Sequence, residues 1–230
     1  MNKPMSTPTS KSLPPLGQSP SLIIFGGTFD PPHSGHAACL KALIAQFPAT
    51  RIAIIPAAVP PPTGTQTAKT PWLTFEARLE LCRLMVSDQC AEEFVDVLDI
   101  EGQLSHPNYT LNTLKALQPS APSNHFGTRL AILVGGDQFA GFDSWHLPDQ
   151  IVEMADLIIV PRANEAIQWP QGEAAKKARV WALNVHTPAA SSTLIREMIQ
   201  SGDALPQGWL TPGVHSRLQQ LAGKAIETRV

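Results

Sequence analysis

The residues best suited to chemistry in this 230-residue chain lie between Gly26 and His36, in the stretch Gly-Gly-Thr-Phe-Asp-Pro-Pro-His-Ser-Gly-His. A short apolar strand, Leu22–Phe25, is expected to end in a double-glycine turn, and two histidines follow, three residues apart, at the expected start of a helix. Glycine lets backbone N–H groups approach an anion closely, and a helix N-terminus adds N–H donors and partial positive charge. Imidazole donors can follow charge that builds up on phosphate oxygens. The pattern therefore predicts a phosphate site.

A second cluster is Ser-Ser-Thr-Leu-Ile-Arg at 191–196. Taken alone, it is typical of a serine or threonine N-cap on an ordinary amphipathic helix. Its functional interpretation uses the same geometry, because capping hydroxyls and free N–H groups would face an anion. Arg196 would lie one turn into the helix, and its planar fork suits phosphate.

Two further features could contact a nucleotide. Gly135-Gly136-Asp137 follows a strongly apolar run, and Trp145 comes eight residues later. A tryptophan at such a place is more often part of the core, but a flat aromatic ring near a nucleotide can stack on a heterocycle.

Better-known fingerprints are absent or fit poorly. Neither G-x-x-x-x-G-K-[ST] nor G-x-G-x-x-G after a strand occurs, which disfavours a simple kinase or dehydrogenase. His33 and His36 could be a metal pair in a zinc hydrolase, with Cys39 as third ligand. Cys39 would lie about 9 Å from His33 along a helix axis, which is poor for one tetrahedral ion.

Apolar runs and helical periodicity alternate along the chain. Strands are expected at 22–25, 51–55, 94–98, 129–134, 157–160 and 180–183, and helices at 35–47, 74–87, from Thr110 to before Pro119, 192–202 and 213–222. This order predicts an α/β fold: a Rossmann-like doubly wound parallel sheet with helices on both faces, in a single domain. Ligands of such folds bind at the carboxyl ends of the strands, where 26–36, 135–137 and the stretch before Ser192 fall.

Composition limits the class of protein. Hydrophobic residues make up 43% and the formal net charge is −2, so the chain is globular and has no basic field for nucleic acid. Three cysteines without a C-x-x-C pair indicate free thiols in a reducing cytoplasm, and no apolar run is long enough for a membrane span. Residues 1–20, rich in Pro, Ser and Thr, are expected to be a flexible tail before a domain at 21–230. The oligomeric state stays open.

Together the motifs resemble those of the nucleotidylyltransferase superfamily. Residues 26–36 resemble its G-x-F-D-P-x-H-x-G-H signature, and 191–196 resemble I-S-S-T-x-I-R. Between them the following elements occur in the order seen in bacterial nicotinate-nucleotide adenylyltransferases: PNYTLNTL at 107–114, GGDQF at 135–139, Trp145 and LIIVPR at 157–162.

The resemblance implies adenylyl transfer in NAD biosynthesis. The 5′-phosphate of nicotinate mononucleotide would attack the α-phosphorus of ATP, giving nicotinate adenine dinucleotide and pyrophosphate. Because the nucleophile is already an anion, no general base is needed, and catalysis would be positioning plus charge stabilisation. Mg²⁺ would be carried by the ATP phosphates, with no metal site built by the protein.

The resemblance also implies roles for particular residues. His33, His36 and Arg196 would be catalytic. ATP would be bound by Gly26, Gly27, Thr28, Gly135, Asp137, Ser192 and Thr193, and nicotinate by Thr110, Trp145 and His146. Asp30 is expected to fix the turn rather than to act on substrate.

The chain departs from the family pattern at two informative places. Val59–Gly64 reads VPPPTG where the family has V-P-P-H-K, and Lys69 is the nearest basic residue that could substitute. His146 stands where relatives have another aromatic residue. Three alternatives remain open: transfer to nicotinamide mononucleotide, transfer to phosphopantetheine, and a non-catalytic nucleotide-binding module.

Overall fold

The structure is a computed structural model that describes residues 19–59, 70–118, 129–161, 167–223 and 228–229. Most of the expected tail and Lys69 lie outside the described residues.

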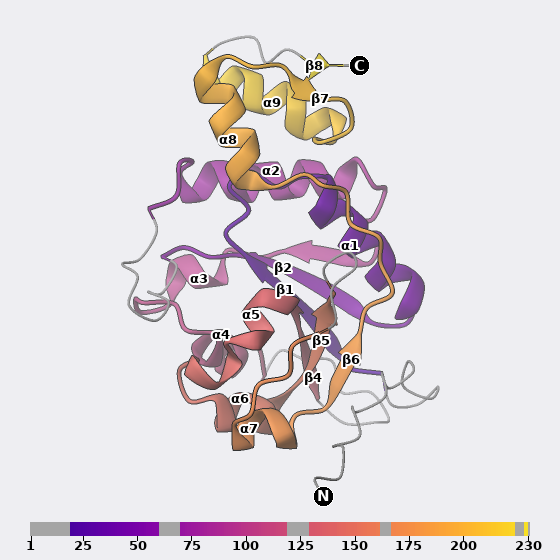
Figure 1. Ribbon diagram of the computed structural model, residues 1–230, viewed down its shortest axis with the longest axis vertical. Helices are drawn as coiled ribbons and strands as arrows, with labels where there is room; N and C mark the ends of the chain where they lie inside the picture. Colours follow the sequence, from indigo (N-terminus) through magenta and orange to yellow (C-terminus); the bar gives the residue numbers. More distant parts are fainter. Residues whose placement is uncertain (1–18, 60–69, 119–128, 162–166, 224–227, 230) are drawn as a thin grey trace, which may run out of the picture.

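Six parallel strands form one sheet in the order β3-β2-β1-β4-β5-β6 (Figure 1). The strands are β1 (Leu22–Gly27), β2 (Arg51–Pro56), β3 (Val95–Val97), β4 (Leu130–Gly135), β5 (Ala155–Val160) and β6 (Val180–Ala182). All five pairings are parallel, as the continuous apolar runs predicted. The doubly wound parallel sheet is therefore confirmed.

The sheet is buried on both faces because successive side chains of a strand point to opposite sides. Along β1, Ile23 and Phe25 enter one hydrophobic cluster, while Leu22 and Ile24 enter the other. These two clusters are the two halves of the core, one on each face of the sheet.

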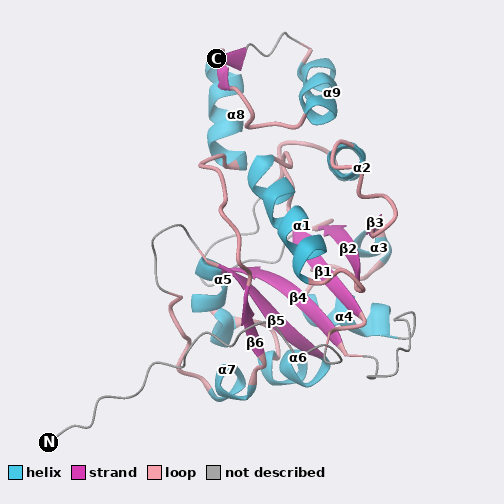
Figure 2. Cartoon of the chain, turned by 90° about the vertical axis from the view of Figure 1, so that its right-hand side faces the viewer, coloured by secondary structure: helices cyan, strands magenta, loops and turns pink. Residues whose placement is uncertain are grey.

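Helices cover both faces (Figure 2). The cluster that contains Phe25 is covered by α1 (Ser34–Gln46), α2 (Phe75–Ser87), α8 (Ser192–Ser201) and α9 (Pro212–Ala222). The opposite cluster receives side chains from α4 (Thr110–Leu117), α5 (Gly136–Ala140), η2 (Phe142–Ser144), α6 (Pro148–Met154) and α7 (Glu173–Lys177). The short α3 (Ile100–Gln103) follows β3, and β7 (Leu205–Pro206) pairs with β8 (Thr228–Arg229). No helix in the described ranges has the length and apolar character that a membrane span requires.

The double glycine does not form the turn that the sequence predicted. Gly26 pairs with Ile55 and Gly27 with Pro56, so both glycines are the last residues of β1. Neither has a positive φ, and extended glycine continues a strand. The chain turns one residue further on, where Phe29 adopts a left-handed φ of 51°.

The strand order changes direction between β1 and β4. The connection from β1 leads to one side of the sheet, and the chain later returns to place β4 on the other side of β1. Their carboxyl ends, Gly27 and Gly135, therefore lie at the switch point where doubly wound folds bind ligands.

Candidate active site

The turn between β1 and α1 is held by Phe29 and Asp30. The Phe29 ring is buried and packs against Phe25, with ring centroids 5.3 Å apart, and against His36 at 4.8 Å. The Asp30 carboxylate accepts hydrogen bonds from the N–H groups of Trp72 (2.7 Å) and Leu73 (2.8 Å). Asp30 thus joins the turn to the segment before α2, in agreement with the structural role expected for it.

The two histidines form a reciprocal cap at the start of α1. The N–H of Gly35 donates to Nδ1 of His33, and the N–H of His33 donates to Nδ1 of His36, each at 3.1 Å. The rings lie 3.9 Å apart between centroids. An Nδ1 that accepts carries no proton, so each neutral ring carries its proton on Nε2.

Both imidazoles are neutral at pH 7. Burial lowers the pKa of His33 to about 4. Burial also lowers the pKa of His36, and a protonated His33 would lower it further. The pair therefore offers two neutral Nε2–H donors that can respond to charge developing on a bound anion.

The sequence analysis expected free backbone N–H groups at the start of α1, but the structure shows two of them bonded within the protein. The N–H of Ser34 donates to the carbonyl of Trp209 at 2.8 Å, and the N–H of Gly35 is taken by His33. The open N–H groups that the sequence predicted at this helix start are thus already satisfied by the protein, because a buried helix end needs partners. What α1 offers an anion is mainly its two imidazoles.

The second motif lies directly against this turn. Arg196 donates from Nη1 to the carbonyl of Asp30 at 2.6 Å, across 166 residues of sequence, and lies 3.6 Å from the Asp30 carboxylate. The Ser192 hydroxyl donates to the carbonyl of Pro31 at 2.9 Å. The second fork nitrogen of Arg196 donates to the Thr193 hydroxyl at 3.3 Å. The structure therefore brings the histidine motif and the arginine motif together.

Helix α8 begins as an ordinary capped helix. Ser191 is the N-cap, and its hydroxyl accepts the N–H of Leu194 at 3.2 Å. Because the Ser192 hydroxyl proton is used on Pro31, the donor that Ser192 can offer a phosphate is its backbone N–H.

Gly26 leaves open space beside the histidine motif. It is exposed, and a Cβ added there would meet nothing within 4 Å. Gly27 differs, since its Cβ would lie 3.1 Å from the Phe29 ring. The Phe29 ring thus favours a small residue at Gly27, whereas the fold leaves room for a side chain at Gly26.

The end of β4 contributes a short helix. Gly135 ends the strand and precedes α5, which carries Asp137 in its first turn. A Cβ on Gly135 would lie 2.8 Å from Oδ1 of Asp137, so glycine is what allows this carboxylate to fold back over the strand end.

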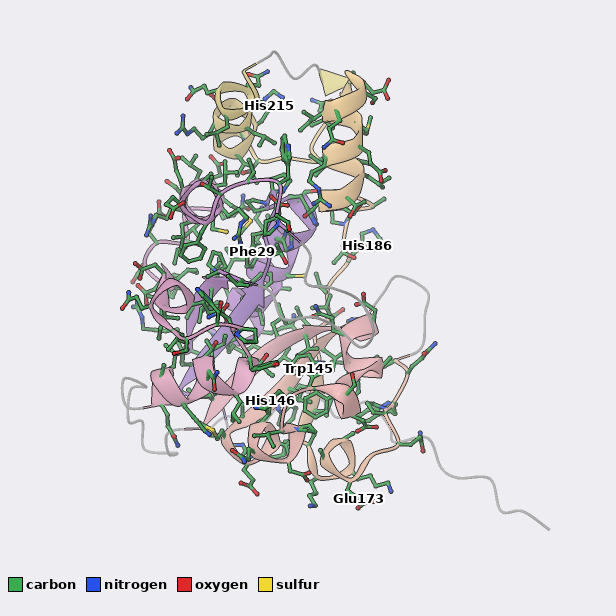
Figure 3. All side chains as sticks on the ribbon, turned by 90° about the vertical axis from the view of Figure 1, so that its left-hand side faces the viewer. Phe29, Trp145, His146, Glu173, His186 and His215 are labelled. Carbon is green, nitrogen blue, oxygen red and sulfur yellow. The ribbon has the colours of Figure 1, made fainter. Side chains whose placement is uncertain are left out.

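The residues expected to bind nicotinate come from the opposite side of the sheet. Thr110 begins α4, Trp145 follows η2 and packs against Phe142 with centroids 5.2 Å apart, and His146 is exposed. Figure 3 places Trp145 and His146 close together on the part of the molecule that carries α4 and α6, and Phe29 on the part that carries α1.

Two site residues were missed by the sequence analysis. The Tyr109 ring stacks on His146, with centroids 4.3 Å apart and an interplanar angle of 22°. The sequence signal for Tyr109 was its place in the PNYT element. The other residue is the buried Arg78, whose signal was a charge on the apolar face of a predicted helix.

The described residues contain no group of three or more His, Cys, Asp or Glu side chains that could hold a metal ion. Cys39, the third ligand considered for zinc, is buried in the core. Burial raises the pKa of its thiol to about 11.

Comparison with known proteins agrees with these features. A family model described as cytidylyltransferase-like matches residues 24–198, from β1 into α8. A protein of Leptospira borgpetersenii named "probable nicotinate-nucleotide adenylyltransferase" is 30% identical over 205 residues, which cover 87% of this chain and 98% of that protein. Proteins of the same name from Coxiella burnetii (35% identical, 63% of this chain) and Acidithiobacillus ferrooxidans (32%, 66%) are each matched over 62% of their own length.

Solved structures show the same fold. The nicotinic acid mononucleotide adenylyltransferase of Plasmodium falciparum, complexed with NaAD, has a TM-score of 0.62 at 15% identity, over 87% of this chain and 95% of that one. The same enzyme complexed with APC gives 0.63 at 16% identity, over 87% and 94%. By the family match and the Leptospira alignment, the chain belongs to the cytidylyltransferase-like family, among the nicotinate-nucleotide adenylyltransferases.

Proposed function

We propose that this chain joins ATP and nicotinate mononucleotide to give nicotinate adenine dinucleotide and pyrophosphate, a step of NAD biosynthesis. One observation carries the proposal: Arg196 is bonded to the backbone of Asp30, three residues before His33. The donors needed by a triphosphate therefore converge from two helix starts. Family membership supports the same reaction.

The chemistry needs no general base. An oxygen of the acceptor 5′-phosphate attacks the α-phosphorus of ATP, a new P–O bond forms, and the bond to the bridging oxygen of pyrophosphate breaks. Charge accumulates on the α-phosphoryl oxygens and on the leaving group. The neutral imidazoles of His33 and His36 donate from Nε2 to these oxygens, and the effect is largest where charge increases in the transition state.

The triphosphate is held from two directions. Gly26, Gly27 and Thr28 contact it through the backbone, and Gly26 leaves the space for it. Arg196 contacts the β- and γ-phosphates with the N–H groups that Asp30 and Thr193 leave unused, since a guanidinium has five donors.

The remaining residues receive the two organic parts. Gly135 and Asp137 contact the adenosine side at the end of β4. Trp145 stacks on the pyridine ring, and the backbone N–H groups of Thr110 and His146 bind its carboxylate. The stack of His146 on Tyr109 would hold these two N–H groups at a fixed separation.

Mg²⁺ enters with ATP in this proposal. In this proposal phosphate oxygens and water would hold the ion. The ion would neutralise charge on the polyphosphate, while the protein supplies imidazole, guanidinium and backbone donors.

We also propose the cytoplasm as the location of this chain. Cys39, Cys82 and Cys90 are all free thiols, as is usual in a reducing compartment.

The direct test compares acceptors under identical conditions. The purified protein, with ATP and Mg²⁺, is given nicotinate mononucleotide, nicotinamide mononucleotide or phosphopantetheine, and pyrophosphate release is measured. Turnover should be fastest with the nicotinate acceptor. A preference for either other acceptor would reassign the substrate, and no pyrophosphate with any of them would refute the activity.

The proposed role of His36 is tested by His36→Asn. The Asn Oδ1 can replace Nδ1 as acceptor for the His33 N–H, while the Nε2–H donor is lost. We expect kcat to fall at least about 10²-fold, with a melting temperature close to that of the wild type. His186→Ala is the control, because His186 is exposed and has no assigned role.

A further inference from the structure

Arg78 is a fully buried arginine that the proposed mechanism does not use. It lies in α2, is 1% exposed and heads the set of the largest fully buried side chains. Burying a guanidinium is costly unless its donors are satisfied. Yet none of the ion pairs between described residues involves Arg78.

Its hydrogen-bond partners are all backbone carbonyls. Nη1 donates to the carbonyls of Thr28 at 2.8 Å and Ala57 at 2.7 Å. Longer bonds run from Nε to Leu73 (3.4 Å) and from Nη2 to Ala58 (3.5 Å). Thr28 directly follows β1 and Ala57 directly follows β2, so Arg78 ties together two adjacent strand ends at the edge where the triphosphate is proposed to bind.

One of these carbonyls, that of Thr28, belongs to the turn between β1 and α1. The Thr28 carbonyl shares its peptide unit with the Phe29 N–H. The Gly27 carbonyl, which accepts from the Ala57 N–H at 2.8 Å, shares its unit with the Thr28 N–H. A hydrogen bond to the carbonyl of a peptide group polarises the N–H of the same group. The bond from Arg78 therefore strengthens and orients a donor of this turn.

We propose that Arg78 is a positioning residue for ATP: it holds the ends of β1 and β2 from inside the protein and places a positive charge behind the turn that meets the triphosphate. The inference rests on the proposed function. Arg78 does not contact the nucleotide and acts through the Thr28 and Ala57 backbone.

The charged groups around Arg78 are compatible with this role. Burial lowers the pKa of the Arg78 guanidinium, while Asp30, Glu76 and Glu101 act in the opposite direction, and arginine stays protonated at neutral pH. The Asp30 carboxylate is already bonded to two backbone N–H groups and paired with Arg196. The positive charge of Arg78 is thus not cancelled by a bonded carboxylate among the described residues.

The test separates the two substrates. Dissociation constants are measured by calorimetry for the Mg²⁺ complex of α,β-methylene-ATP and for nicotinate mononucleotide, with wild type, Arg78→Met and Arg78→Lys. Arg78→Met should weaken binding of the ATP analogue by about tenfold or more and leave binding of the acceptor within about twofold. Arg78→Lys, which keeps the charge but not the fork, should lie between Arg78→Met and the wild type.

Arg129→Met is the matched control. Arg129 also bonds backbone carbonyls, those of Val152 (3.1 Å) and Glu153 (3.3 Å), but it pairs with the Asp156 carboxylate as well and lies just before β4 at the amino end of the sheet. Its loss should lower the melting temperature without a preferential effect on the ATP analogue.

Two results would overturn the proposal: unchanged affinity for the analogue, or an equal loss for both substrates, which would mark Arg78 as merely structural. If Arg78→Met does not fold, Arg78→Lys is judged by the same criterion. Failure of the proposed function would be seen separately, as wild-type protein that neither binds the analogue nor releases pyrophosphate.

Discussion

Gly26 is a glycine that the fold itself does not need. It is exposed, its φ is not positive, and an added Cβ would meet nothing within 4 Å. Gly26→Ala should therefore leave the free energy of unfolding unchanged or raise it by up to about 1 kcal/mol. Because the new methyl group would occupy the space in which phosphate is proposed to bind, ATP affinity should fall about tenfold or more.

Denaturant unfolding and calorimetry on one preparation check both halves of this prediction. Gly27→Ala is the comparison, since its Cβ must displace the Phe29 ring and should cost about 1–3 kcal/mol of stability. A stable Gly26→Ala protein with normal ATP affinity would contradict the assigned approach of phosphate.

The histidine pair makes stability depend on pH in a defined direction. Folding lowers the pKa of His33 from 6.5 to about 4 and also lowers that of His36. The unfolded chain therefore binds protons that the folded protein does not, and stability falls as the pH drops from 6.5 towards 4. Above pH 6.5 the histidines are neutral in both the folded and the unfolded chain, so their titration does not reduce stability there.

Urea midpoints between pH 7 and pH 4.5 test this prediction. Carboxylates also titrate near the lower limit, so the wild type is compared with the double variant His33→Asn/His36→Asn, in which Asn can still cap α1. The midpoint of the wild type should fall more steeply over this interval. Parallel curves would show that the imidazoles are not held neutral.

For single residues, the sequence predicted the residue types of the site better than their contacts. The phosphate motif and Arg196 were singled out from residue type and spacing, and the structural role of Asp30 from the family resemblance. That the N–H groups of Ser34 and Gly35 are already satisfied depends on Trp209 and on the His33 rotamer, and no local pattern encodes either.

The start of α8 contacts the histidine motif, which is distant in sequence. Two neighbouring serines have different roles there: one caps the helix, and the other bonds to the histidine motif. Ser191 caps the helix through Leu194, whereas Ser192 bonds the carbonyl of Pro31. Each Ser→Ala change should cost about 1 kcal/mol of stability. Only Ser192→Ala removes one of the bonds between α8 and the histidine motif, so only it should raise the KM for ATP, by about fivefold or more.

Steady-state kinetics with the two variants decide this prediction. The Ser191→Ala protein is the control, with a comparable loss of melting temperature and a KM for ATP within about twofold of the wild type. Equal KM values for both variants would mean that the bond between Ser192 and Pro31 does not position α8.

Among the elements, length decided what could be predicted. The apolar runs of β1, β2, β4 and β5, and the long periodic helices α1 and α2, were placed to within about two residues. The short α3, α5, α6 and α7 were missed, because five or so residues carry too little periodicity. These short helices form where the chain leaves a strand end or returns to one, so tertiary packing rather than local preference selects them.

In the whole molecule, the residues proposed to bind the triphosphate and those proposed to bind the acceptor lie on opposite sides of the sheet. The triphosphate residues belong to the side covered by α1, α2 and α8, and the acceptor residues to the side with α4, η2 and α6. Each side has its own core cluster, and the sheet lies between the helices of the two sides (Figure 2). This division could be predicted in outline from alternating strands and helices, but the pairing of Tyr109 with His146 could not, because 37 residues separate them and neither position belongs to a periodic segment.

Binding of the two substrates should therefore be separable by mutation. Trp145 packs on Phe142 within one core cluster, while Arg196 bonds to Asp30 beside the other. Trp145→Ala removes the proposed stacking surface for the pyridine ring and should weaken binding of nicotinate mononucleotide about tenfold, with ATP affinity within about twofold of the wild type. Arg196→Ala should show the reverse, a loss for ATP and little change for the acceptor. Calorimetry with each substrate alone measures the four dissociation constants, two for each variant. If either variant weakens both substrates equally, the triphosphate and the pyridine ring are not bound on opposite sides of the sheet, and that assignment is wrong.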